Sequence, residues 1–125
     1  MGLFSGLLGN AGEVDVADVE QELASILAEG EKPEQVFKLI RDLIVFTNRR
    51  LVLIDKQGLT GSKKEYMSIP YRSIVRFAAE TKGHFDLESD LKIWLSGSET
   101  PISKTFSKDG NIMSVQKALA TYVCR

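Results

Sequence analysis

DLIVFTNRRLVLIDKQGLTGSKKEYMSIPYRSI, residues 42–74, says more about the architecture of this 125-residue chain than any other stretch. Two short apolar runs, at 43–46 and 51–54, are rich in the β-branched, aromatic and aliphatic residues that strands prefer. Between them, Asn48 and Arg49 fit a two-residue loop, because Asn tolerates the left-handed conformation that hairpin turns require. The stretch therefore predicts an antiparallel hairpin.

This hairpin has two apolar faces. The register set by a two-residue loop places four residues on each face: Phe46, Leu51, Ile44 and Leu53 on one, and Val45, Val52, Leu43 and Ile54 on the other. A hairpin with one face in water would alternate polar and apolar residues. We therefore expect something to cover the second face, and either a helix of the same chain or a second subunit would suffice.

Further strands and two helices are predicted around the hairpin. A helix near 16–28, capped by Asp15, carries Val16, Val19, Leu23 and Ile26 at helical spacing, and Gly30 and Pro33 end it. Residues 34–42 predict a strand with some helical character, and the later strands are expected at 64–70, 73–80, 91–95 and 101–106. In the strand expected at 73–80, Val75, Phe77 and Ala79 should face one way. A closing helix should bury Ile112, Val115, Leu119 and Tyr122.

The predicted fold class is mainly β (α+β), with about seven short antiparallel strands forming a sandwich or small barrel. The amphipathic helix at the end of the chain suits the open end of such a barrel. We expect one domain over residues 15–125, preceded by a flexible apolar segment at 1–14. That segment lacks a basic region and is too short for a secretory signal, although its apolar side chains could touch a membrane.

Composition limits the classes of function. The chain has 16 basic and 17 acidic side chains, a net charge of −1, which argues against a dedicated nucleic-acid binder. The single cysteine, Cys124, forms no disulfide within the chain, and the cytoplasm is the expected compartment.

Motifs that suggest chemistry are incomplete. GLTGSKK at 58–64 lacks the Gly-Lys-Ser/Thr end of a phosphate-binding loop, and the acidic residues at 86–90 lack the rest of a calcium loop. His84, the only histidine, lies in a polar turn. We therefore predict no catalytic residues, no metal and no cofactor.

Residues 40–74, which are the quoted stretch preceded by Ile40 and Arg41, and AAETKGHFDLESDLKIW at 78–94 resemble the bacterial pleckstrin-homology-like domain family, and the resemblance covers roughly residues 15–124. FTNRRL, DKQGLTG and SIPY are the most specific stretches. The resemblance implies seven antiparallel strands in two near-orthogonal sheets, capped by a C-terminal helix. It also implies assembly into cyclic rings, pentamers among them, in which neighbouring sheets form a hydrophilic surface that binds another protein.

Eukaryotic pleckstrin-homology domains often bind phosphoinositides through a Lys followed, several residues on, by a basic-x-Arg pattern. The matching region here offers only Lys38 and Arg41, so the pattern is absent and headgroup binding is not expected. Binding to anionic membrane surfaces nevertheless stays open as an alternative function.

The resulting prediction is a non-enzymatic domain whose partners are copies of itself, most simply in a pentamer, and an unidentified protein. The residues predicted for the oligomer interface are apolar or aromatic: Leu43, Val45, Val52, Ile54 and Trp94. The residues predicted for a polar partner-binding surface are basic: Arg49, Arg50, Lys63 and Lys64.

Overall fold

The computed structural model describes residues 15–39, 42–57, 63–81, 88–107 and 111–125. The elements run in the order α2 (Val16–Glu22), β1 (Pro33–Lys38), β2 (Leu43–Thr47), β3 (Arg50–Gln57), β4 (Lys63–Pro70), a 3-10 turn η1 (Tyr71–Ser73), β5 (Ile74–Thr81), β6 (Glu88–Leu95), β7 (Ile102–Ser107) and α3 (Ile112–Val123). The predicted N-terminal segment 1–14, the glycine-rich turn and His84 lie outside the described residues.

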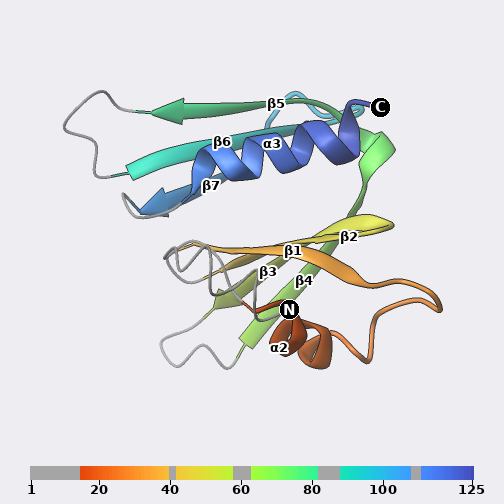
Figure 1. Ribbon diagram of the computed structural model, residues 1–125. Coiled ribbons are helices and arrows are strands. Elements are labelled where there is room, and N and C mark those ends of the chain that lie inside the picture. The colour runs from red at the N-terminus through yellow and green to blue at the C-terminus, as the bar shows by residue number, and fades with distance from the viewer. Residues whose placement is uncertain (1–14, 40–41, 58–62, 82–87, 108–110) are drawn as a thin grey trace.

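The strands form two antiparallel sheets (Figure 1). One has four strands in the order β1-β2-β3-β4, and the other has three in the order β5-β6-β7. The predicted seven strands and two helices are therefore confirmed. Within the described residues, however, no strand of one sheet pairs with a strand of the other, so the sheets do not close into a true barrel.

The β2–β3 hairpin has the predicted register, with Phe46 opposite Leu51 and Val45 opposite Val52. The predicted reason for the turn is wrong, because no described residue other than glycine has a positive φ. Asn48 acts through its side chain instead. Its Oδ1 accepts from the backbone N–H of Lys32 at 2.8 Å, and its Nδ2 donates to the carbonyl of Gly30 at 3.0 Å. The amide thus ties the hairpin tip to the segment that leads into β1.

Two apolar clusters form the core. The inter-sheet cluster fills the space between the sheets and includes the buried stripe of α3: Phe37, Leu39, Ile44, Phe46, Leu51, Leu53, Ile69, Ile74, Leu91, Ile93, Phe106, Ile112, Val115, Ala118, Leu119 and Tyr122. The outer cluster lies on the far side of the four-stranded sheet, beneath α2: Val19, Leu23, Val36, Leu43, Val45, Val52 and Ile54. The two faces of the hairpin divide between these clusters as predicted.

The outer cluster corrects the predicted oligomer interface. Leu43, Val45, Val52 and Ile54 are each at most 6% exposed within a single chain, because Val19 and Leu23 pack on them. Of the two covers that the sequence left open, the structure has the helix of the same chain. These four side chains therefore present no surface to a second copy, and only Trp94 remains of the predicted interface.

Two local predictions fail for physical reasons. The helix predicted to reach residue 28 ends at Glu22, and in the turn that follows the N–H groups of Ala24 and Ile26 donate three residues back, to Gln21 and Leu23, as in a 3-10 turn. The carbonyl of Ile26 accepts from Arg50 Nη2 at 2.6 Å. In β5, the register shifts between Ile74 and Arg76, so the intervening Val75 is 59% exposed and does not share the inner face with Phe77.

Candidate functional site

The four basic residues predicted to form one surface lie at opposite ends of the β3–β4 ladder. Arg50 pairs with Pro70 at one end, and Gln57 pairs with Lys63 at the other. At about 3.3 Å per residue, seven residues of strand separate the ends by roughly 23 Å. The structure therefore does not bring Arg49 and Arg50 together with Lys63 and Lys64. These four residues therefore do not support the hypothesis of a single basic patch that binds an anionic membrane.

At the first end, Arg50 is held by a dense set of hydrogen bonds. Its Nε and Nη2 donate to the two carboxylate oxygens of Glu31 at 2.8 and 2.9 Å, and Nη1 donates to Ser68 Oγ at 2.8 Å. The carboxylate of Glu31 also accepts from Thr47 Oγ1 at 2.7 Å and from the N–H of Ala28 at 2.9 Å. This network fixes the turn after α2 to the hairpin tip.

Glu31 keeps its charge although it is only 5% exposed. Burial by itself raises the pKa of a carboxyl group, but the hydrogen bonds from Arg50, Ala28 and Thr47 outweigh that effect. Together with the charge of Arg50 they lower the pKa of Glu31 to about 2. The charges of Glu31 and Arg50 therefore cancel at neutral pH.

A cavity of about 430 Å³ opens beside this network, which we call the hairpin-tip pocket. It is lined by the turn after α2, the hairpin tip and the end of β4: Ile26, Ala28, Glu31, Arg49, Arg50, Ser68 and Pro70. Arg49 donates from Nη2 to the carbonyl of Glu29 at 3.2 Å. Ile26 is 36% exposed and gives the pocket an apolar wall.

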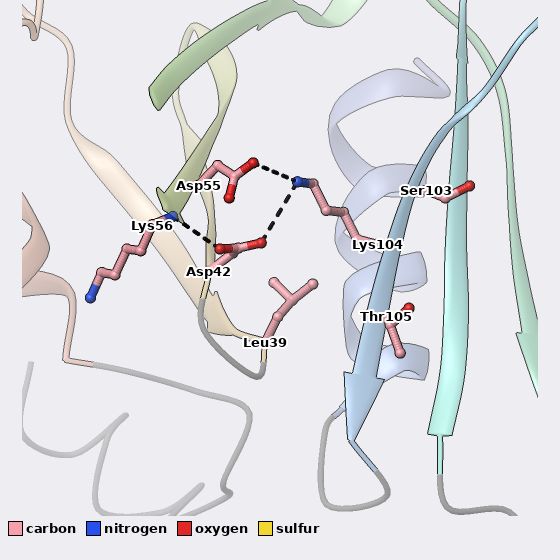
Figure 2. Close-up of a pocket in the computed structure, with 7 residues that line it drawn as sticks. All are labelled: Leu39, Asp42, Asp55, Lys56, Ser103, Lys104 and Thr105. Atoms are coloured by element: carbon pink, nitrogen blue, oxygen red, sulfur yellow. Dashed lines mark hydrogen bonds and ion pairs between the residues drawn. The ribbon is translucent and has the colours of Figure 1, made fainter. Parts of the chain in front are cut away.

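A second cavity, of about 350 Å³, lies where β7 of one sheet faces β3 and the connection between β1 and β2 of the other (Figure 2). Lys104 points from β7 toward two carboxylates, with its Nζ 3.8 Å from Asp42 and 4.0 Å from Asp55. Asp42 also accepts from the backbone N–H of Lys56 at 3.0 Å. Figure 2 shows Ser103 on the other side of β7, away from these charges.

The inter-sheet cavity is best understood as a polar tie between the sheets. Lys104 is 17% exposed at its side chain, and its ammonium lies between two opposite charges. Among the described residues, these are the ion pairs that join one sheet to the other. The lysine is thus already engaged, and the site offers a ligand little unpaired charge.

Trp94 lies on the outer face of the three-stranded sheet, as predicted from the alternation in β6. The guanidinium of Arg76, its neighbour on β5, stacks over the indole ring at 4.5 Å from the centroid. Both side chains remain partly accessible, and the residue between Ile74 and Arg76, Val75, is exposed beside them. We call Val75, Arg76 and Trp94 the Trp94 patch.

The sequence analysis missed the residues that form the hairpin-tip pocket, apart from its two arginines. Glu31 and Ser68 are 37 residues apart, and only the fold brings them to the same Arg50 side chain. One signal was available, since Glu31 stands beside the expected helix end at Gly30. Nothing in the local pattern indicated that its charge would be buried.

Comparison with known proteins places the chain in a class. The family model described as "Bacterial PH domain" matches residues 2–123. The chain therefore belongs to the bacterial PH domain family. The match begins nearer the N-terminus than the resemblance noted from the sequence, which started at about residue 15.

Individual relatives agree with that class. The chain is 61% identical to the uncharacterized protein YjqA of Bacillus subtilis (strain 168), over 99% of both chains. It is similar to the crystal structure of a pleckstrin homology domain from Shewanella amazonensis SB2B, with 45% identity, 98% of each chain covered and a TM-score of 0.85. A DUF1696 family protein with a pleckstrin-homology domain from Shewanella loihica PV-4 has 43% identity over 91% of this chain and 97% of its own, with a TM-score of 0.78.

Neither described helix is long and apolar enough to cross a lipid bilayer.

Proposed function

We propose that this chain is a non-enzymatic PH-like domain that assembles into a cyclic homo-oligomer and mediates protein–protein interaction. The ring size that the family resemblance implies is a pentamer. Because the apolar outer face of the hairpin is covered by α2, the proposal rests on a different surface, the edge strand β4.

The exposed edge of β4 is the observation that carries the proposal. β4 is the last strand of the four-stranded sheet, and all of its eight residues except Ile69 are exposed. Tyr66 and Met67 are 40% and 37% exposed. Natural proteins protect long edge strands with charges or proline, because an open edge accepts another strand. Charged residues, Lys63 to Glu65, stand at the start of β4 and a proline at its end, but the three exposed residues in the middle, Tyr66 to Ser68, carry no charge.

A ring with five members requires two different surfaces on each copy, because the contact is heterologous and repeats around the axis. The edge of β4 supplies one surface. The Trp94 patch, on the other sheet, supplies the second, since Trp and Arg are enriched at interface centres and methionine packs well against aromatic rings. Met67 of one copy would then contact Trp94 of the next.

Native mass spectrometry at micromolar concentration tests the assembly. The wild-type chain should give a closed oligomer of five copies, and Met67→Lys should give monomers because a lysine on the edge opposes strand pairing. Met113→Lys is the matched control, since Met113 is also an exposed methionine, 61% exposed, but lies on α3. It should leave the ring intact.

A mixing experiment tests the two-surface arrangement. Met67→Lys and Trp94→Ala each remove a different half of the proposed contact, so each variant alone should be monomeric. Mixed together, they retain one intact contact per pair and should form a dimer that grows no further. A wild-type chain that remains monomeric at micromolar concentration would contradict self-assembly. A mixture without dimers would contradict the pairing of these two surfaces.

A further inference from the structure

The hairpin-tip pocket combines apolar walls with one positive charge that forms no ion pair within the part of the chain that the structure describes. Three charged side chains line it: Glu31, Arg49 and Arg50. Glu31 and Arg50 neutralise each other through two direct hydrogen bonds. The remaining charge in the lining is the positive charge of Arg49.

Arg49 has hydrogen-bonding capacity to spare. A guanidinium group carries five N–H donors. Among the described residues, the side chain of Arg49 makes one hydrogen bond, from Nη2 to the carbonyl of Glu29. The side chain is exposed to solvent. It can therefore present two parallel N–H groups to a carboxylate, the geometry in which arginine binds carboxylates most strongly.

Ser68 adds a second donor to the same pocket. Its Oγ accepts from Arg50 Nη1 at 2.8 Å, and a hydroxyl that accepts one hydrogen bond still has its own proton to donate. Because Arg50 is fixed by Glu31 and by the carbonyl of Ile26, Ser68 Oγ is held in place. Arg49 and Ser68 thus line one cavity as two donors suited to an anion.

The walls of the pocket select for an apolar group next to that anion. Ile26, Ala28 and Pro70 contribute hydrocarbon surface, and the volume of about 430 Å³ lies in the range of pockets that bind small ligands.

We propose that the hairpin-tip pocket binds the C-terminal residue of a partner protein. The apolar side chain of that residue would occupy the pocket, and its α-carboxylate would be bound by Arg49 and Ser68. The inference rests on the proposed protein-binding role and names the chemistry of the partner. It does not require the ring, because the pocket is formed by a single chain.

Methyl NMR of the full-length protein, with N-acetyl-leucine as the probe, tests this site. The δ1-methyl signal of Ile26 should shift on titration, whereas that of Ile93, which is 1% exposed in the inter-sheet cluster, should not. N-acetyl-leucinamide, which has the same side chain and no carboxylate, should bind roughly tenfold more weakly, as expected for the loss of a charge-assisted hydrogen bond.

Variants separate the carboxylate contact from general attraction of charge. Arg49→Gln should reduce the preference for the carboxylate probe over the amide to about onefold, and Arg49→Lys should restore part of it. Lys63→Gln removes an equal charge from the far end of β4 and should leave the preference unchanged. Equal binding of the two probes to wild type, no shift of the Ile26 signal, or an equal loss in Lys63→Gln would overturn the proposal.

Two variants distinguish a failure of the ring proposal from a failure of the pocket proposal. Met67→Lys should dissociate the oligomer and still bind N-acetyl-leucine, because Met67 does not line the pocket. Arg49→Gln should lose the carboxylate preference and still assemble. A Met67→Lys monomer that no longer binds the probe would contradict a pocket formed within one chain.

Discussion

The outer faces of the two sheets differ in polarity and in whether a helix covers them. The outer face of the four-stranded sheet is apolar, with Val45 and Val52 completely buried beneath α2. The outer face of the three-stranded sheet carries Arg76, Lys92 and Trp94 and has no described helix over it. A strand that is apolar on both faces therefore indicates that another element covers its outer face, whereas a strand that alternates polar and apolar residues is stable with its outer face in water.

The covered face also depends on polar anchors. α2 has only seven residues, too few to be stable as an isolated helix. Its position is secured by Val19 and Leu23 in the outer cluster, by an ion pair between Glu22 and Lys64 at 3.0 Å, and by the Glu31 network in the turn that follows. The outer face of the three-stranded sheet, which we call the open face, carries no described helix that such contacts would have to hold. Its cation–π pair of Arg76 and Trp94 is therefore accessible to a partner.

The largest expected effect comes from placing a charge beneath α2. Val52→Asp would bury a carboxylate without a partner at a position that is fully buried, and should lower the free energy of unfolding by roughly 3–5 kcal/mol. Ser103→Asp, at an exposed site opposite Lys92 on the open face, should change it by less than about 0.5 kcal/mol. Urea denaturation of both variants measures the contrast, and a similar small loss in both would show that α2 is not a stable cover.

An intermediate effect is expected for Glu31→Gln, which removes the charge that anchors the turn after α2. Losing charge-assisted hydrogen bonds to Arg50 should cost roughly 2 kcal/mol at neutral pH. The pKa of Glu31 is lowered in the folded state, from 4.5 to about 2, so its stabilising contribution is complete above pH 4.5 and is lost as the pH falls toward 2.

Denaturation curves between pH 5 and pH 2 check the assignment of that contribution. The wild-type protein should lose stability more steeply with acid over this range than Glu31→Gln, because the variant has no proton to take up at this position. Parallel curves for the two proteins would show that the Glu31 carboxylate does not anchor the covered face.

The smallest expected effect concerns the open face. Trp94→Ala removes an accessible cation–π pair with Arg76 and should cost about 0.5–1 kcal/mol in a monomeric background such as Met67→Lys. Arg76→Gln in the same background should cost a similar amount, and the double variant should cost less than the sum. Thermal unfolding of the three variants measures this coupling, and strict additivity would argue that the two side chains do not interact.

Local patterns in the chain were sufficient for several features. The two-residue loop gave the register of the hairpin and placed Phe46 and Val45 on opposite faces, and helical spacing identified the buried stripe of α3 from Ile112 to Tyr122. In each case the side-chain period of a strand or helix fixes which residues share a face. The bulge at Val75 was not predicted, because Val75 is apolar, as Phe77 and Ala79 are, and the three fit an uninterrupted alternation.

What the amino-acid sequence determined by itself is thus the set of elements, the hairpin pairing and the family, because these follow from short-range periodicity and from motifs within one continuous stretch. The tertiary structure alone decided that α2, and not a second subunit, covers Val45 and Val52, and that Arg50 is neutralised by Glu31 while Arg49 is not. Those outcomes depend on which distant segments meet in space. The contacts between these distant segments determine which side chains are buried and which charges are paired. The periodicity of a short stretch of sequence gives neither.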